Sequence, residues 1–317
     1  MKKIAIFSYD AGSSEILKAL YKKYKKHYIF QLYVIPYSPF DKISKDIKDK
    51  TNVDNNRENI YEKLDKFCPE LIIYGTSWQI KTHEVFLEYA NKNSIKSIAF
   101  LDHWVFYKER FSSIFPDFIA TFDNHSTKVA KSLDLPNVVQ IKNYYFENLK
   151  NKYSSMSRNK KKQILFLSEP TSKVALKRFG DEKYWGFDES DIYLEVLNFS
   201  KKLNMSLLTR LHPSDSKEKY LNFDIDTNFS NNSLLEDIAV CDIIIGIDTV
   251  ALYIAYFLGE KAIAFMPTKK REVTIPIPKE NITDDLYSFK ISSIKTKDTD
   301  IFDNSIEFDE FLKKEFK

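Results

Sequence analysis

Glycine is scarce in this chain of 317 residues, which contains only six glycines. Average usage of about 7% would give about 22. A glycine that remains in such a sequence is more often one that the backbone requires, because glycine alone adopts left-handed conformations at no steric cost. The six positions therefore mark turns of interest: Gly12, Gly75, Gly180, Gly186, Gly246 and Gly259.

Cysteines and long apolar runs are also few. Cys68 and Cys241 form no C-x-x-C pair and show no metal-ligand spacing, which argues against a disulfide scaffold or a zinc site and indicates a reducing compartment. The apolar run at residues 4–7 is too short for a signal peptide. The uncharged stretch at 249–259 is far shorter than the roughly 20 residues that span a bilayer. We therefore expect a cytoplasmic chain without a membrane span.

The chain lacks an excess of either charge, since 48 basic residues balance 45 acidic ones to a net charge of +3. This balance argues against nucleic acid as a partner. The exception is local: in residues 13–24 and just beyond, apolar residues recur at helical spacing, and Lys18, Lys22, Lys25 and Lys26 occupy the other face. That face is either a solvated surface or a patch that meets an acceptor or an anionic membrane from the cytoplasmic side.

Short β-branched or aromatic runs alternate with helical patterns, which predicts parallel sheets with crossover helices. A first domain, residues 1–150, has predicted strands at 3–8, 30–35, 71–74, 97–101, 118–122 and 138–141 and helices at 13–24, 56–67, 81–91 and 125–132. The polar segment 147–163 is predicted to be a connector. A second domain, residues 151–317, has predicted strands at 164–167, 206–208, 243–245 and 262–265 and helices at 189–203, 233–239 and 249–258. Its tail adds edge strands at 272–277 and 287–292 and a helix at 306–315.

The predicted fold class is α/β, with two Rossmann-like domains. Neither domain contains G-x-G-x-x-G. The pair resembles the GT-B architecture of many nucleotide-sugar glycosyltransferases and of UDP-N-acetylglucosamine 2-epimerases. In such a pair ligands bind in a cleft that the carboxyl ends of both sheets face. We therefore expect the first domain to bind the acceptor, the second to bind the nucleotide donor, and functional residues to follow strands.

Three strand ends of the first domain carry polar residues. "SYDAGSSE" places Asp10, Gly12, Ser13 and Ser14 at a turn into a helix, where Asp10 is a candidate base and the serines are candidate caps. "YGTSW" adds Thr76 and ends at Trp78. The alternative for "SYDAGSSE" is a capped turn without a functional role.

The third strand end, "FLDHWVFYKERF", contains Asp102, His103, Trp104 and Arg110. An acid, an imidazole and a large ring suit the binding of a sugar acceptor. The alternative is a loop in which Trp104 simply covers the core. Either Asp10 or Asp102 is a candidate general base for an acceptor hydroxyl, and the sequence does not choose between them.

In the second domain, the strand at 206–208 leads into "RLHPSD". Pro213 fixes its own φ and restrains His212 toward extended conformations, which holds the imidazole at the strand end. An imidazole at that place can protonate or hydrogen-bond a departing phosphate near neutral pH. The alternative is a purely structural histidine.

A further strand end contains Gly246, Asp248 and Thr249, followed by an apolar helix that Gly259 ends. The hydroxyl of Thr249 and the first N–H groups of this helix predict a phosphate site. "LFLSEP" places Ser168 and Glu169 at another turn, where Glu169 is a candidate acceptor for a ribose or sugar hydroxyl, with ordinary loop polarity as the alternative. Residues 177–190 are predicted to be a flap over the cleft.

"RLHP" and "SLLEDIAVCDIIIGIDTVALYIAYFLGEKAIAF" resemble the second domain of bacterial CMP-sugar glycosyltransferases, namely the sialyltransferase, polysialyltransferase and Kdo-transferase groups. "DAGSSEIL" and "IAFLDHWVFYKERF" resemble polysaccharide-biosynthesis proteins of that broad type. The resemblance implies that His212 contacts the CMP phosphate together with a hydroxyl pair at the helix start. Here Asp248 and Thr249 replace the usual two serines. An aspartate there repels phosphate unless it points away or accepts a nucleotide hydroxyl.

These observations predict a glycosyltransferase that moves a sugar from a nucleotide-sugar, CMP-activated by the resemblance, to a cell-surface polysaccharide or glycolipid. We expect no cofactor and no metal, since the donor is a substrate and no D-x-D-like carboxylate pair follows a suitable strand. One alternative is a nucleotide-sugar epimerase or hydrolase of the same architecture. The other, suggested by the replaced serine pair, is a non-catalytic protein that binds nucleotide-sugar.

Overall fold

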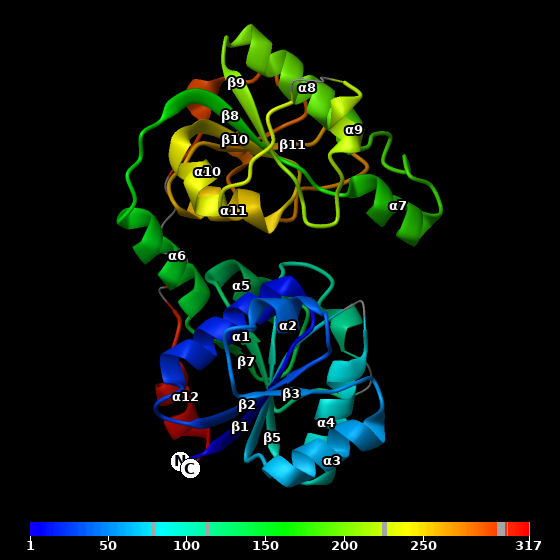
Figure 1. Ribbon diagram of the computed structural model, residues 1–317, viewed down its shortest axis with the longest axis vertical. Coiled ribbons are helices and arrows are strands. Elements are labelled where there is room, and N and C mark those ends of the chain that lie inside the picture. The colour runs from blue at the N-terminus through cyan, green and yellow to red at the C-terminus, as the bar shows by residue number, and fades with distance from the viewer. Residues whose placement is uncertain (78–79, 112–113, 224–226, 297–301, 303, 317) are drawn as a thin grey trace. The chain divides into compact units, whose positions relative to one another are not determined.

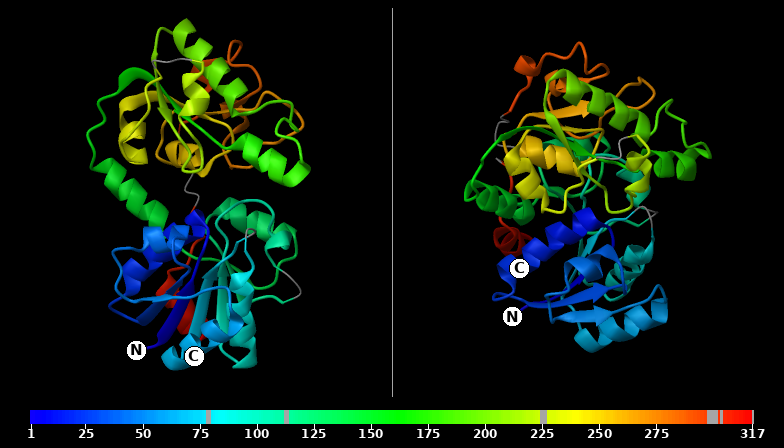
Figure 2. Two further views of the ribbon diagram at one scale, coloured as in Figure 1. Left: turned by 45° about the vertical axis from the view of Figure 1, so that its right-hand side comes forward. Right: turned by 45° about the horizontal axis from the view of Figure 1, so that its top comes forward.

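A computed structural model describes residues 1–77, 80–111, 114–223, 227–296, 302 and 304–316 (Figure 1). The chain divides into two compact units: unit 1 is Met1–Asn148 together with Asp300–Lys317, and unit 2 is Leu149–Thr299. Each unit contains one parallel sheet with helices packed on its faces (Figures 1 and 2). Two α/β domains were predicted, and both are present.

The sheet of unit 1 has seven strands in the described part of the chain, in the order β3-β2-β1-β4-β5-β6-β7. The strands are β1 (Lys3–Phe7), β2 (Ile29–Val34), β3 (Lys50–Asn52), β4 (Leu71–Gly75), β5 (Lys96–Phe100), β6 (Phe118–Thr121) and β7 (Val138–Gln140). The helices are α1 (Ala11–Tyr24), α2 (Pro39–Ile43), α3 (Arg57–Phe67), α4 (Thr82–Lys92), α5 (Asn124–Ser132), α12 (Phe308–Glu315) and the short 3₁₀ helix η1 (Lys108–Arg110). The strand order reverses between β1 and β4, which is where Rossmann-like domains bind ligands.

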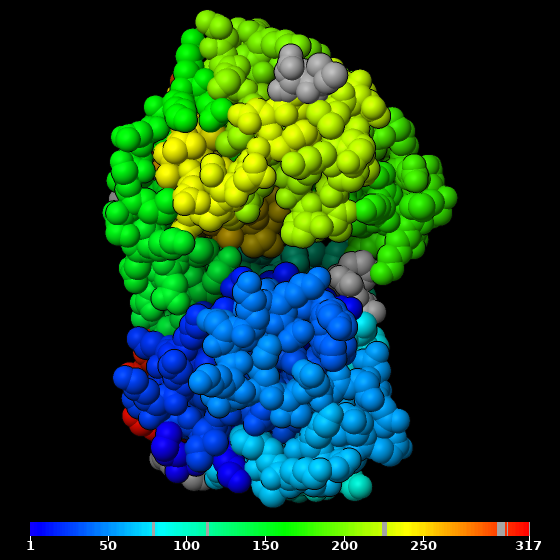
Figure 3. Space-filling model, viewed as in Figure 1, coloured from blue at the N-terminus to red at the C-terminus, as the bar shows by residue number. Residues whose placement is uncertain are grey.

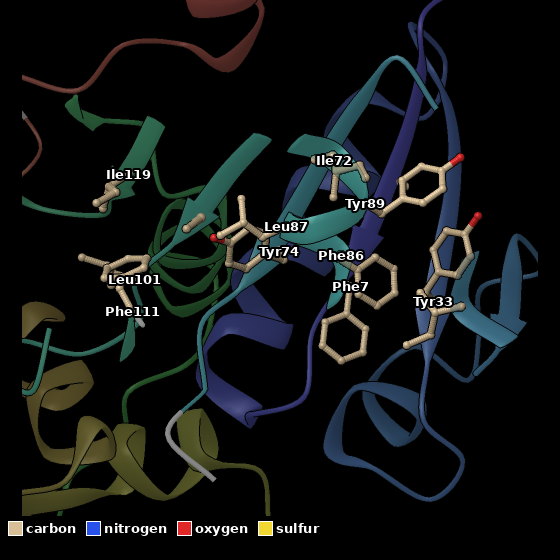
Figure 4. Packing of buried hydrophobic residues seen from close by; sticks show 14 of the residues in the cluster. Phe7, Tyr33, Ile72, Tyr74, Phe86, Leu87, Tyr89, Leu101, Phe111 and Ile119 are labelled. Carbon is tan, nitrogen blue, oxygen red and sulfur yellow. The ribbon is translucent and has the colours of Figure 1, made fainter. Parts of the chain in front are cut away.

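One face of this sheet packs against α3, α4 and α5 because alternate strand residues point to it. Figure 4 shows the centre of this layer, where the ring of Phe86 from α4 stacks on Phe7 of β1 with a centroid distance of 4.5 Å. Tyr33 of β2 meets the same ring edge-on at 5.5 Å. These side chains are buried, and burying an aromatic side chain of this size stabilises the fold by about 2 kcal/mol or more.

The opposite face carries α1 and the C-terminal helix α12, which lie side by side in both figures (Figures 1 and 2). Phe308 of α12 packs on Tyr24 of α1, and Phe311 packs edge-on against Phe118 of β6. Ile306 also forms a parallel bridge with Ile141, just beyond β7. The tail therefore belongs to unit 1, whereas residues 151–317 were all predicted to form the second domain. Phe308 and Phe311 are buried by the first sheet, which a division by chain position does not anticipate.

Unit 2 contains a five-stranded parallel sheet, within the described residues, in the order β12-β11-β10-β8-β9. Its strands are β8 (Lys161–Leu167), β9 (Ser206–Arg210), β10 (Cys241–Gly246), β11 (Ala262–Phe265) and β12 (Ile282–Thr283). Its helices are α7 (Thr171–Phe179), α8 (Glu189–Lys202), α9 (Glu218–Leu221), α10 (Leu234–Val240) and α11 (Val250–Phe257), with the 3₁₀ helices η2 (Lys279–Asn281) and η3 (Ile291–Ser293). α6 (Tyr144–Ser154) contains the boundary between the units.

Helix α8 packs its buried side chains against one face of this sheet, while α10 and α11 contact β10 and its neighbours. Trp185 and Phe187 belong to the core under α8, so part of the predicted flap at 177–190 is interior. Its first residues lie in α7, and Leu176 and Phe179 of this helix are exposed. The segment that contains α7 forms part of the surface of unit 2 in Figure 3.

Two predictions of secondary structure are wrong. The segment 147–163 is not a connector, because α6 runs through Ser154 and β8 starts at Lys161. Buried Tyr144 and Tyr153 anchor the helix through hydrogen bonds to Glu307 and Glu260. The predicted edge strands at 272–277 and 287–292 are irregular or 3₁₀, and β12 is the edge strand instead.

The lysine-rich face of α1 is partly neutralised within unit 1, since Lys18 and Lys22 both pair with Asp46. Contact of this face with a membrane stays a prediction. Within the described residues, no helix combines the length and the apolar character that crossing a membrane requires.

Candidate functional site

At the carboxyl ends of β1 and β4 in unit 1, buried hydroxyl groups bond to one another. Ser13 and Ser14 of α1 both interact with the hydroxyl of Ser8, at 2.8 and 3.1 Å, and both also donate to the carbonyl oxygen of Asp10. All three serines are fully buried. The predicted serines are thus brought together, and they fasten the start of α1 to the end of β1.

Asp102, which follows β5, lies in the same cluster. Its Oδ2 accepts the backbone N–H of Ser13 at 2.9 Å, and its Oδ1 pairs with Arg110 at 2.9 Å. Arg110 also donates to the hydroxyl of Thr76 at 3.0 Å. The side chains of Arg110 and Asp102 are only 2% and 1% exposed, so this is a buried ion pair. The structure therefore brings the predicted residues Asp102, Arg110, Thr76 and Ser13 together, with both oxygens of Asp102 engaged.

Two glycines allow this close packing. A β-carbon on Gly12 would lie 2.6 Å from Oδ2 of Asp102, and one on Gly75 would lie 2.5 Å from the side chain of Ser13. Neither position can hold a larger residue unless the cluster moves. Gly12 lies in α1 and Gly75 ends β4, and neither has a positive φ, so close packing rather than a left-handed conformation requires these two glycines.

The other residues predicted in unit 1 have different surroundings. Trp104 is 2% exposed, packs on Phe122 and donates its indole N–H to Asp123 at 2.9 Å, so it lies in the core. That position matches the alternative in which the ring covers the core. His103 is half-buried, and Asp10 is the half-buried N-cap residue of α1. Trp78 lies outside the described residues.

In unit 2, His212 follows β9 in a tight turn. The N–H of Asp215 donates to the carbonyl oxygen of His212 at 2.9 Å, with Pro213 at the second position of the turn. The ring atom Nδ1 accepts the backbone N–H of Ser214 at 3.2 Å and lies 2.8 Å from its hydroxyl. A backbone N–H can only donate, so the neutral imidazole carries its hydrogen on Nε2.

The protonation of His212 is set by its surroundings. Burial lowers the pKa of the imidazole from its ordinary value, while the charges of Glu169 and Asp215 oppose that shift and Lys173 adds to it. The ring is therefore neutral near pH 7. Since the residue is half-buried and Nε2 has no partner among the described residues, this N–H can donate to a ligand.

Glu169, which follows β8, lies between the ends of β9 and β10. Its Oε2 accepts the backbone N–H of Asp248 at 2.9 Å, and its Oε1 pairs with Arg271. The guanidinium of Arg271 also lies 4.9 Å from the ring centre of Trp185. Arg271 was not predicted as a site residue, because it lies in an irregular segment of the chain.

Asp248 does not present a free carboxylate to a ligand at the start of α11. Its Oδ1 accepts the backbone N–H groups of Thr274 and Ile275 at 2.8 and 3.0 Å, and its Oδ2 accepts the hydroxyl of Thr274. Burial and the charge of Glu169 raise the pKa of Asp248, and Arg271 opposes that shift. The aspartate thus holds the 271–275 segment against the end of β10, with both of its oxygens engaged by that segment.

Thr249 is the N-cap residue of α11, and its hydroxyl accepts the N–H of Ala251 at 3.4 Å. Gly246 ends β10, where a β-carbon would touch Leu167 and Thr249 at 3.4 Å. Both Thr249 and the next residue are half-buried, so the amino end of α11 is partly accessible. The positive end of a helix dipole favours anions there.

The ends of β9, β8 and β10 are adjacent in the sheet order, and hydrogen bonds join the residues that follow them. His212 N–H donates to Ser168 Oγ at 2.8 Å, Glu169 follows Ser168, and Glu169 accepts the N–H of Asp248 next to Thr249. The structure thus places the predicted residues of the second domain along one sheet edge. Arg210, at the end of β9, pairs instead with the buried Asp237.

In the described part of the chain, no group of three or more His, Cys, Asp or Glu side chains is arranged to hold a metal ion.

No family model matches this chain, and no curated protein does. Solved structures do. A UDP-N-acetylglucosamine 2-epimerase from Rickettsia bellii aligns with 94% of this chain and 89% of its own at 12% identity and a TM-score of 0.62. MurG from Acinetobacter baumannii aligns over 91% and 83% at 10% identity and a TM-score of 0.52. The wall teichoic acid polymerase TagF, soaked with CDPG, aligns over 92% and 80% at 13% identity and a TM-score of 0.50.

At these identities the likeness shows the fold alone. The chain has the GT-B type of fold with two Rossmann-like domains, as predicted.

Proposed function

We propose that this protein is a glycosyltransferase that takes a sugar from a nucleotide-sugar donor, CMP-activated, and transfers it to a polysaccharide or glycolipid acceptor. One observation carries the proposal: a neutral imidazole and the amino end of α11 lie on the same sheet edge, joined through Ser168, Glu169 and Asp248. An N–H donor and a helix amino end are the groups that bind a phosphate without a metal.

In this scheme the nucleotide phosphate lies between Nε2 of His212 and the first N–H groups of α11. When the bond between the sugar and the phosphate breaks, the phosphate oxygen gains charge, and the N–H of His212 strengthens its hydrogen bond to it. Glu169 accepts a ribose or sugar hydroxyl. The choice of a cytidine nucleotide as the leaving group rests on the resemblance of "RLHP" and of residues 233–265 to CMP-sugar glycosyltransferases.

The proposed acceptor hydroxyl loses its proton to a carboxylate, and its oxygen then forms the new bond to the sugar. Asp10 and Asp102 were both predicted for this role. Asp102 is engaged by Arg110 and by the N–H of Ser13, and both carboxylates stay candidates for this role.

A second candidate is a nucleotide-sugar epimerase or hydrolase. The likeness to the Rickettsia bellii 2-epimerase favours it, since that alignment covers most of both chains. Such an enzyme would act on the donor without any acceptor.

Two measurements test the proposal. Isothermal titration with CMP, CDP and UDP is expected to show tightest binding for a cytidine nucleotide, and the absence of binding to CMP and CDP would contradict the CMP-activated donor. Release of nucleotide from CMP-, CDP- and UDP-activated sugars is then compared with and without bacterial polysaccharide. A transferase requires the acceptor, whereas equal release of nucleotide without it identifies a hydrolase. An epimerase would change the sugar of the donor without releasing nucleotide, which analysis of the donor after incubation detects.

A further inference from the structure

Beneath the turn that contains His212 lies a group of buried charged and hydroxyl side chains that the proposed chemistry does not use. We call Ser168, Glu189, Asp215, Lys219 and Tyr220 the Asp215 network. The side chains of Asp215 and Glu189 are 0% and 1% exposed. Burying two carboxylates costs several kcal/mol each unless partners surround them, so each contact in the network matters.

Asp215 is the centre of the network. Tyr220 donates its hydroxyl to Oδ2 at 2.5 Å, and Lys219 pairs with Oδ1 at 3.2 Å. Lys219 also pairs with Glu189, which in turn accepts the N–H and the hydroxyl of Ser172 at the start of α7. Burial alone would raise the pKa of Asp215, but Tyr220 and Lys219 outweigh it and lower that pKa, so the carboxylate is charged.

The network reaches His212 by two routes. The hydroxyl of Ser168 accepts the N–H of His212 at 2.8 Å and also interacts with Asp215, since it contributes to the lowered pKa of that carboxyl. The N–H of Asp215 donates to the carbonyl oxygen of His212 and closes the turn. The backbone of His212 is therefore held at both its N–H and its carbonyl oxygen.

We propose that Asp215, fixed by Lys219 and Tyr220, is a positioning residue for His212. It holds the turn so that Ser214 donates to Nδ1, which keeps the imidazole hydrogen on Nε2, and its charge acts on the ring. The catalytic consequence rests on the proposed function, whereas the positioning itself does not.

The charged groups that face the ring come from three segments: Glu169 after β8, Asp215 in the turn, and Lys173 of α7, which also donates to the carbonyl oxygen of Ser214. The two carboxylates raise the pKa of His212 and the lysine lowers it. Replacing Asp215 by Asn removes one of the two raising charges, so the pKa of the ring should fall.

The test is an NMR titration of the protein labelled with ¹⁵N-histidine. Five histidines are present, and a His212→Gln spectrum assigns the signal of interest. Wild type is expected to show an unprotonated Nδ1 and a protonated Nε2 throughout the neutral range. In Asp215→Asn we expect the ring pKa to fall and a second tautomer to appear.

Lys219→Met is expected to produce the same mixed tautomers by releasing Asp215. Its matched control is Lys217→Met, because Lys217 is an exposed lysine of the same segment that contacts Phe229 instead. The control should keep the wild-type pKa and tautomer. Identical spectra for wild type, Asp215→Asn and Lys219→Met would overturn the proposal.

If Asp215→Asn does not fold, Ser168→Ala is the second variant, since it removes only the hydroxyl that joins Asp215 to the N–H of His212. A wild-type tautomer and pKa in folded Ser168→Ala would also overturn the proposal.

Adding CMP to wild type separates this inference from the proposed function. If the His212 signal does not respond to CMP, the phosphate site is wrong. The differences between wild type and the variants, measured without nucleotide, still decide whether Asp215 positions the ring.

Discussion

The two units use the carboxyl ends of their parallel strands in different ways. In unit 1, Asp102 bonds to Arg110 and Ser13, the serines bond to one another, and the side chains of the ion pair are almost inaccessible. In unit 2, carboxylates and backbone groups also satisfy one another, but His212 and Thr249 stay half-buried beside them. The same type of sheet edge thus carries a structural cluster in unit 1 and an accessible candidate site in unit 2. Burial and hydrogen-bond partners distinguish the two, and residue type does not.

The largest expected effect is on turnover. His212→Ala should lower the rate of sugar transfer by roughly 10²- to 10⁴-fold, because it removes the hydrogen bond to the leaving phosphate. Folding should change little, since the ring is only half-buried. Rates and circular dichroism of wild type and the variant check this, with exposed His27→Ala of unit 1 as the control. Full activity of His212→Ala would contradict the claim that the sheet edge of unit 2 carries the functional site.

The next effect is on stability. Arg110→Met should destabilise unit 1 by about 3–5 kcal/mol, because it leaves the carboxylate of Asp102 buried without its cation. Urea unfolding measures this, and Arg57→Met, which breaks an exposed pair with Glu88, is the control that should unfold like wild type. CMP binding to folded Arg110→Met should be unchanged. A variant as stable as wild type would mean that this cluster is not structural.

The pH dependence of stability tests the same contrast, because His83 of unit 1 is buried whereas His212 of unit 2 is half-buried. This buried histidine of α4 has its pKa lowered to about 4 from an ordinary 6.5 by burial, and Nδ1 has no partner among the described residues. The imidazole of His83 takes up a proton below pH 6.5 in the unfolded chain but only near pH 4 in the folded chain. Its contribution to the free energy of unfolding is therefore complete above pH 6.5 and is lost as the pH falls.

Between pH 7 and pH 5, wild type should therefore lose roughly 2 kcal/mol more unfolding free energy than His83→Gln. Urea unfolding of both proteins at the two pH values gives this difference. Equal losses would show that the histidine of the folded protein titrates normally.

The smallest effects compare two helix caps of unit 2. Thr249 caps α11, and Ser233 caps α10 with a capping box. Each replacement by Ala should cost about 1 kcal/mol of stability. Only Thr249→Ala should also weaken CMP binding, by roughly tenfold, because only α11 begins at the proposed phosphate site. Titration calorimetry measures the CMP affinity of both variants. Equal affinities would show that the phosphate does not bind at the start of α11.

Much of the fold could be predicted from the sequence because strand patterns of the Ile4–Phe7 kind and helical spacing are local signals. The site residues at strand ends could be predicted for the same reason, since a glycine or a hydroxyl after an apolar run marks a turn. The tertiary surroundings of those residues could not be predicted. Trp104 and Asp102 were predicted as ligand-binding, but tertiary contacts with Asp123 and Arg110 bury them.

Arg271 and Asp215 show the other limit. Arg271 lies in an irregular segment, and its meaning depends on Glu169, about a hundred residues away. Asp215 was visible in "RLHPSD" but gained significance only through Lys219 and Glu189. The tail was assigned to the wrong domain because its two aromatic anchors find their partners in the first sheet.

The most direct test is a crystal structure of the protein with bound CMP. The account predicts a phosphate within hydrogen-bond distance of Nε2 of His212 and of the first N–H groups of α11, with Glu169 near a hydroxyl of the nucleotide. A nucleotide bound elsewhere, with His212 and Thr249 both in contact with solvent alone, would contradict it.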